Sequence, residues 1–152
     1  MTWKPHVTVA AIIERDQRFL MVEEHTEQGR RFNQPAGHLE SGESLLDAVT
    51  REVQEETGWH FAPETLIAVQ LWRKTSDHPT FLRFCFAGQL LKHDEQRALD
   101  PDIIATHWLS RAQLASNPED LRSPLVLRSI DEYLSGQRYP LALLHTFLDP
   151  HE

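Results

Sequence analysis

Three glutamates at helical spacing are the residues of this sequence best suited to chemistry. Glu52, Glu55 and Glu56 lie three and four positions apart, so in a helix all three project from one side. Two carboxylates about 5.5 Å apart repel each other by roughly 3 kcal/mol at an effective dielectric constant near 20. A divalent cation would turn this repulsion into ligation, and oxygen ligands suit a hard ion such as Mg2+ or Mn2+. The alternative interpretation is an acidic helix face that is simply solvated.

A helix must position these carboxylates, and the neighbouring residues predict one. Leu45, Val49 and Val53 recur at every fourth position and form an apolar stripe that overlaps the side of the glutamates. Ser44 is a good N-cap and Gly58 a good C-terminal stop, so the helix is expected between them. The carboxylates are therefore expected at the edge of a buried face.

The same stretch resembles the sequence motif of a known family. It matches the Nudix box, Gly-x5-Glu-x7-Arg-Glu-hydrophobic-x-Glu-Glu-x-Gly-hydrophobic, at every fixed position. Those positions are Gly37, Glu43, Arg51, Glu52, Val53, Glu55, Glu56, Gly58 and Trp59. The resemblance implies an enzyme that hydrolyses a diphosphate linked to another group, with water attacking phosphorus. It also implies the Nudix fold, a mixed β-sheet sandwiched between helices.

The resemblance assigns roles to individual residues of the box. It implies that Glu52, Glu55 and Glu56 are catalytic residues and ligands of Mg2+, for which Mn2+ can substitute, with the backbone carbonyl of Ala36 as a further ligand. Glu52 is also implied to orient or deprotonate the attacking water. The residues with implied structural roles are Gly37, Glu43, Arg51 and Gly58. 

Some members of the family carry the general base on a later loop. In this chain that loop contains Glu95, Asp100 and Asp102, and the sequence does not choose among them.

Several side chains outside the box are candidates for substrate binding. Arg31 and Arg73 flank expected strands and could hold outer phosphates. Arg83 is a charge on an otherwise apolar strand, where it could reach a phosphate or equally pair with a carboxylate. Trp3, Trp72 and Trp108 could stack on a ring, although tryptophan is more often a core residue.

Composition limits the partners. The chain has 152 residues and a net charge of −8, which argues against a nucleic-acid polymer or an anionic membrane. A small phosphorylated molecule is the expected partner, and the protein is expected to be a monomer or a homodimer. Cys85 is the only cysteine, which excludes an intramolecular disulfide and a thiolate zinc site. No signal peptide and no membrane-spanning run is recognised, so a cytoplasmic location is expected.

The pattern of the remaining chain predicts a single α/β (α+β) domain over residues 1–152, with a core at about 6–134 and a tail at 135–152. Strands are expected at 6–13, 18–23, 31–35, 81–90 and 103–109, and either two strands or one long strand at 59–73. Polar loops are expected at 14–17, 24–30 and 92–102. A short helix is expected from Ser110 and a longer one from Ser123 to Ser135.

A closer resemblance extends over nearly the whole chain. The segments HVTVA at His6, NQPAGHLE at Asn33, FLRFCFA at Phe81, LRSPLV at Leu121 and SGQRYPL at Ser135 resemble the NudJ group of Nudix phosphatases. This implies release of terminal orthophosphate from nucleoside tri- and diphosphates, from the pyrophosphate of the thiamine pyrimidine precursor and from thiamine pyrophosphate.

Two other functions remain open at this point. The first is a pyrophosphohydrolase that cuts inside the phosphate chain and releases pyrophosphate, because the box does not define which phosphorus is attacked. The second is a non-catalytic ligand-sensing Nudix domain. That function would favour loss of a box carboxylate, and none is lost here.

Overall fold

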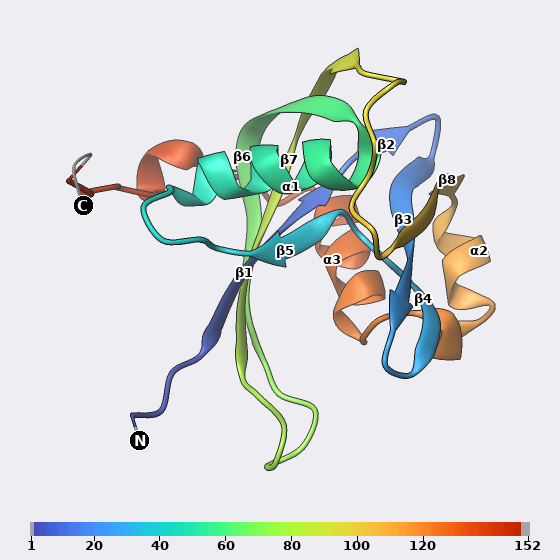
Figure 1. Ribbon diagram of the computed structural model, residues 1–152, viewed down its shortest axis with the longest axis horizontal. Helices are drawn as coiled ribbons and strands as arrows, with labels where there is room; N and C mark the ends of the chain where they lie inside the picture. Colours follow the sequence, from blue (N-terminus) through green and yellow to red (C-terminus); the bar gives the residue numbers. More distant parts are fainter. Residues whose placement is uncertain (1, 150–152) are drawn as a thin grey trace.

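The computed structural model describes residues 2–149; Met1 and the last residues of the expected tail, 150–152, lie outside the described part. The strands are β1 (His6–Ile12), β2 (Glu14–Arg15), β3 (Arg18–Thr26), β4 (Gly29–Asn33), β5 (Ala36–His38), β6 (Trp59–Trp72), β7 (Phe81–His93), β8 (Ile103–Leu109) and β9 (Tyr139–Pro140). The helices are α1 (Leu45–Thr57), α2 (Arg111–Ala115) and α3 (Leu125–Leu134), with 3-10 turns η1 (Pro118–Asp120) and η2 (Leu141–Leu143). Figure 1 shows their arrangement.

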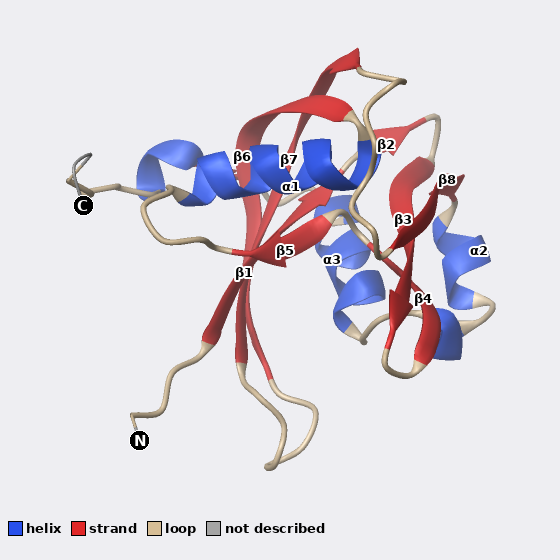
Figure 2. Cartoon of the chain, in the orientation of Figure 1, coloured by secondary structure: helices blue, strands red, loops and turns tan. Residues whose placement is uncertain are grey.

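The strands form two sheets. In the larger sheet the order is β5-β1-β7-β6-β9. β1 runs parallel to β7 and antiparallel to β5, so this sheet is mixed, as predicted. In the smaller sheet β3 pairs with β2, β4 and β8. β6 and β7 form one long antiparallel hairpin whose tip projects from the body of the molecule (Figure 2).

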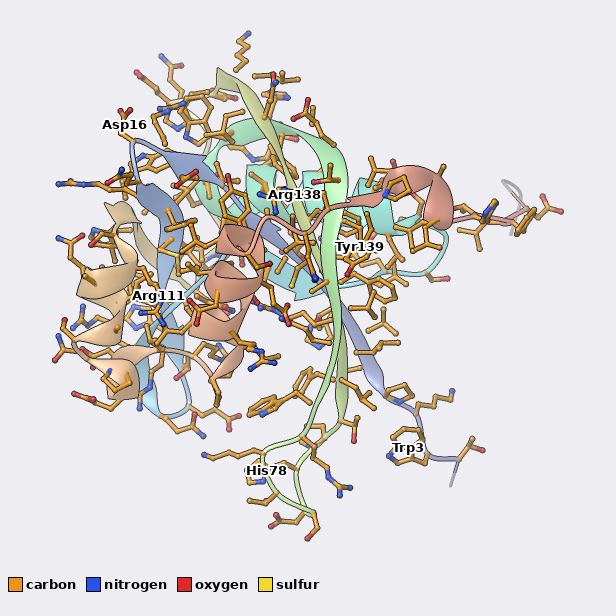
Figure 3. All side chains as sticks on the ribbon, turned by 180° about the vertical axis from the view of Figure 1, so that it is seen from behind. Trp3, Asp16, His78, Arg111, Arg138 and Tyr139 are labelled. Carbon is orange, nitrogen blue, oxygen red and sulfur yellow. The ribbon has the colours of Figure 1, made fainter. Side chains whose placement is uncertain are left out.

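Helices cover both faces of the larger sheet because β1 is apolar on both of its faces. Val9 and Ala11 pack with Val49 of α1, while Ala10 on the opposite face packs with Ile130 of α3. α1 lies in front of the strands in Figure 1, and α3 lies on the near side in the reverse view of Figure 3. The expected mixed sheet between helices is confirmed.

The prediction of a polar loop at 24–30 is wrong. β3 continues to Thr26 and turns through residues 27–28 into β4, which begins at Gly29. Gly29 has φ 101°, a conformation that glycine adopts readily, so this stretch can turn back as a tight hairpin.

Other boundaries differ from the predictions in smaller ways. The turn expected at 14–17 contains only Asp16 and Gln17, both at positive φ, because β2 pairs back onto β3. The stretch expected at 59–73 is one long strand, β6, which ends at Trp72. Its register shifts at three places, one of them next to Pro63, which has no amide N–H to donate. Within residues 2–149, no helix has the length and apolar character needed to cross a membrane.

Candidate functional site

The candidate site lies where α1 meets the free edge of β5. β5 pairs with β1 on one side only, so its other edge faces α1. On that edge the amide of Ala36 donates to Oε1 of Glu56 at 2.8 Å, and the carbonyl of His38 accepts from Nη2 of Arg51 at 3.0 Å. The N–H and C=O of one strand residue point to the same side. The carbonyl of Ala36 therefore also faces the edge that carries the carboxylates.

The ends of α1 lie where the sequence predicts them. The hydroxyl of Ser44 accepts from the amide of Asp47 at 3.0 Å, and Gly58 ends the helix in the left-handed region with φ 80°. Between these ends, Glu52 and Glu56 are only 8% and 7% exposed. The alternative of a solvated acidic face is therefore wrong for these two glutamates.

Gly37 is required by the close approach of a carboxylate. A Cβ atom at this position would overlap the carboxylate carbon and both oxygens of Glu52. The φ of Gly37 is not positive, so its backbone conformation alone would accept other residues. The missing side chain lets Glu52 lie directly on β5.

Arg51 holds the acidic side chains in place. Its guanidinium donates to both oxygens of Glu43, at 3.0 and 2.7 Å. It also donates to Glu52 at 2.8 Å and to Glu55 at 3.1 Å. This pairing holds the pKa of Glu43 below its usual value. The guanidinium of Arg51 thus connects the loop before α1 with the last two turns of that helix.

Two of the carboxylates are difficult to ionise in the absence of a cation. Burial raises the pKa of Glu52 to about 7, although Arg51 acts in the opposite direction. Burial raises the pKa of Glu56 well above its usual value, and the charge of Glu52 raises it further. A divalent cation would remove this electrostatic cost, so the donor set fits a hard metal ion.

An aspartate from a later loop joins the carboxylates. Oxygens of Glu52, Glu55 and Asp100 all lie within 4.8 Å of one another. The amide of Asp100 donates to the carbonyl of Glu55 at 3.0 Å, which fixes the loop on the end of α1. Glu56 is not in this group; its Oε1 accepts from the amide of Ala36 instead.

The three loop carboxylates that the sequence leaves open are now distinguished by position. Asp100 lies in the cluster, Asp102 lines the same cavity, and Glu95 is exposed and is not among the residues that line it.

A cavity of about 1170 Å³ extends from these carboxylates across the larger sheet. Glu52 and Glu56 line one part of it, and Trp72, Phe81 and Arg83 line another. The space is therefore large enough for a drug-sized ligand that also contacts the metal-binding edge.

Arg83 lies in this cavity, but its donors are largely engaged. The guanidinium donates to Asn33 Oδ1 and Gln34 Oε1, both at 3.0 Å, and to Ser129 Oγ at 2.9 Å. These partners are uncharged, so Arg83 holds the chain just before β5 rather than pairing with a carboxylate there.

The other two predicted arginines are placed differently. Arg31 and Arg73 are not among the residues that line the cavity. Two cations that sequence analysis missed do line it, Lys74 and Arg122, and Arg122 is paired with Glu24 at 3.0 Å. No local pattern distinguishes these two from other exposed cations, because only the folded chain brings them to the site.

Known proteins are similar to this chain over most of its length. A family model described as the NUDIX domain matches residues 4–129. The phosphatase NudJ of Escherichia coli K12 is 44% identical over 147 residues, which cover 95% of this chain and 94% of that protein. The solved structure of a NUDIX hydrolase from Nitrosomonas europaea is 45% identical, with a TM-score of 0.91 over 95% of this chain and 98% of that one.

A more distant solved structure shares the fold. The MutT NUDIX hydrolase from Burkholderia pseudomallei is 21% identical, with a TM-score of 0.72 over 85% of this chain and 98% of that one. The predicted family resemblance and the predicted fold are both confirmed.

Proposed function

The chain belongs to the Nudix hydrolase family, and from this we propose that it is a phosphatase that removes the terminal phosphate of small organic di- and triphosphates. Nucleoside tri- and diphosphates, the thiamine pyrimidine precursor pyrophosphate and thiamine pyrophosphate are the proposed substrates. The choice of a phosphatase rests on the 44% identity to the phosphatase NudJ of Escherichia coli K12. All box carboxylates are present, which supports catalysis rather than ligand sensing.

We propose Mg2+ as the cofactor, with Mn2+ as a substitute. Nudix hydrolases generally use divalent ions, and the oxygen-only group of Glu52, Glu55 and Asp100 fits such an ion. Glu56 and the carbonyl of Ala36 complete the proposed ligand set, since both lie at the same edge of β5. When bound, the ion neutralises phosphate oxygens and activates water.

The protein groups position the reactants. Glu52, fixed between Gly37 and Arg51, is proposed to orient the attacking water and accept its proton. Asp100 is the alternative base, because it is the later-loop carboxylate in the cluster. Lys74 and Arg122 carry positive charge along the cavity, and Arg122 is proposed to bind substrate phosphates.

The chain is also proposed to be one catalytic domain. Met21 of the smaller sheet packs with Ala10 of the larger one, and Leu20 packs with Val9 on the other face. The two sheets thus share both cores, which supports one folding unit over residues 1–152. We propose a cytoplasmic location for it, as a monomer or homodimer that acts on small molecules.

The proposal is tested by phosphate release from a nucleoside triphosphate with and without Mg2+. Activity should require the ion and disappear in excess EDTA, and Glu56→Gln should abolish it. Glu119→Gln is a matched control, because Glu119 is exposed in η1, outside the cavity. Undiminished turnover in EDTA would contradict the metal-dependent mechanism. Release of pyrophosphate would instead favour the alternative, a pyrophosphohydrolase that cuts inside the chain.

A further inference from the structure

A row of aromatic rings crosses the larger sheet on its α3 face. In the strand register Trp72 of β6 is opposite Phe81 of β7, and Phe81 is opposite His6 of β1. Ring centroids are 6.2 Å apart for Trp72 and Phe81 and 5.4 Å apart for Phe81 and His6. His38 of β5 extends the row, 5.5 Å from His6. We call these four residues the aromatic row.

α3 does not cover the aromatic row. Val126 and Ile130 of α3 pack on Ala10, in the middle of β1, whereas His6 lies at the start of that strand. Trp72 and Phe81 are consequently only half-buried, and His6 and His38 are exposed. Figure 3 shows the hairpin around His78 extending past the helices, with the paired strands uncovered there. The rings therefore lie on a stretch of the sheet that is open to solvent, outside the core.

The aromatic row is continuous with the proposed catalytic site. Trp72, Phe81 and His38 line the same cavity as Glu52 and Glu56. The row ends on β5, the strand whose free edge holds the carboxylates. From β6 to β5 there are three strand spacings, about 14 Å in all. A ligand bound at the carboxylates can thus extend along the aromatic row.

We propose that the aromatic row binds the flat ring of the substrate's organic group by stacking, while its phosphates lie at α1. This inference rests on the proposed function. Lys74, two residues beyond Trp72 in the chain, lines the same cavity and adds a positive charge at the Trp72 end of the row. Stacking on aromatic faces accepts any flat ring, since every base has a π-face. The substrates are therefore ring-bearing phosphates with little discrimination among rings.

The test compares two non-hydrolysable ligands by calorimetry in the presence of Mg2+. One is a nucleoside triphosphate with a methylene bridge between the β and γ phosphorus atoms, and the other is methylenebisphosphonate, which has no ring. Trp72→Leu should weaken binding of the nucleotide relative to the bisphosphonate by roughly 5- to 150-fold, as expected for one lost stacking contact. Trp72→Phe should restore most of the difference. Trp3→Leu is the matched control, because Trp3 is 69% exposed and does not line the cavity.

Each other outcome would overturn the inference. Equal weakening of both ligands, or no weakening of either, would remove the ring-binding role of the aromatic row. A wild-type dimer that dissociates in Trp72→Leu, seen by sedimentation, would assign the row to a subunit interface. If the wild type binds neither ligand in Mg2+, the proposed function itself fails, and that result is distinct from loss of ring preference alone.

Discussion

Replacing Gly37 by alanine tests whether the position of Glu52 controls catalysis. The added methyl group would overlap the carboxylate of Glu52, whose normal carbon contacts are about 3.5–4.0 Å. The carboxylate must therefore retreat by more than about 1 Å. It cannot do so freely, because Arg51 holds one of its oxygens at 2.8 Å.

The substitution is expected to lower mainly the catalytic rate. A displacement of about 1 Å in a positioning group costs about 100-fold, or about 2.7 kcal/mol of transition-state stabilisation. The overpacked side chain should also destabilise the fold by about 1–3 kcal/mol. kcat for orthophosphate release, measured at saturating substrate and Mg2+ and corrected for the folded fraction, should fall about 100-fold.

Gly136→Ala separates loss of stability from loss of positioning. Gly136 has φ 86° and open space around its Cα, so alanine there strains the backbone by about 1 kcal/mol without touching the site. This variant should melt at a lower temperature yet keep its kcat. A folded Gly37→Ala protein with kcat within threefold of the wild type would refute the argument that Gly37 exists to admit Glu52.

Three further predictions concern the charges. Glu52→Gln and Glu56→Gln should each lower kcat by at least about 100-fold and, above pH 7, leave the metal-free melting temperature unchanged or higher, because the cost of ionising two buried carboxylates close together is removed; a lower melting temperature at that pH would contradict the repulsion. The folded pKa of Glu52 is raised from 4.5 to about 7, so the unfolded chain loses this proton first and the metal-free protein loses stability as pH rises from about 4.5 to 7. The loss from Glu52 reaches about 3 kcal/mol above pH 7, and calorimetric melts of the wild type and Glu52→Gln should show a shallower pH dependence in the variant. Arg51→Met leaves Glu43 and Glu52 without their main cation and should destabilise the protein by about 3 kcal/mol in urea unfolding; an unchanged midpoint would show that the network is not structural.

The parts of the site that were predictable from sequence are those encoded locally. The spacing of the glutamates, the cap at Ser44 and the stop at Gly58 each depend on residues within a few positions, and the structure contains the helix they define. The hairpin at Gly29 was missed because polar residues at 24–30 suggest a loop, whereas pairing between β3 and β4 makes them strand.

Features set by long-range pairing were not predictable. The neutral partners of Arg83 come from β4, the segment after it and α3, so only the folded chain brings them together. The aromatic row likewise depends on the parallel register of β1 and β7, which aligns His6 with Phe81. A single sequence gives alternation along each strand but not the register between distant strands.

The attacked phosphorus is the central point of the proposed function, and hydrolysis in 18O-water tests it most directly. The wild-type protein with Mg2+ and a nucleoside triphosphate should yield orthophosphate carrying the label, with nucleoside diphosphate as the first unlabelled product, both followed by 31P NMR and mass spectrometry. Attack at the terminal phosphorus predicts this pattern, since the oxygen of water stays with the phosphorus that it attacks. Label in pyrophosphate or in nucleoside monophosphate as the first products would contradict the proposal and establish internal cleavage.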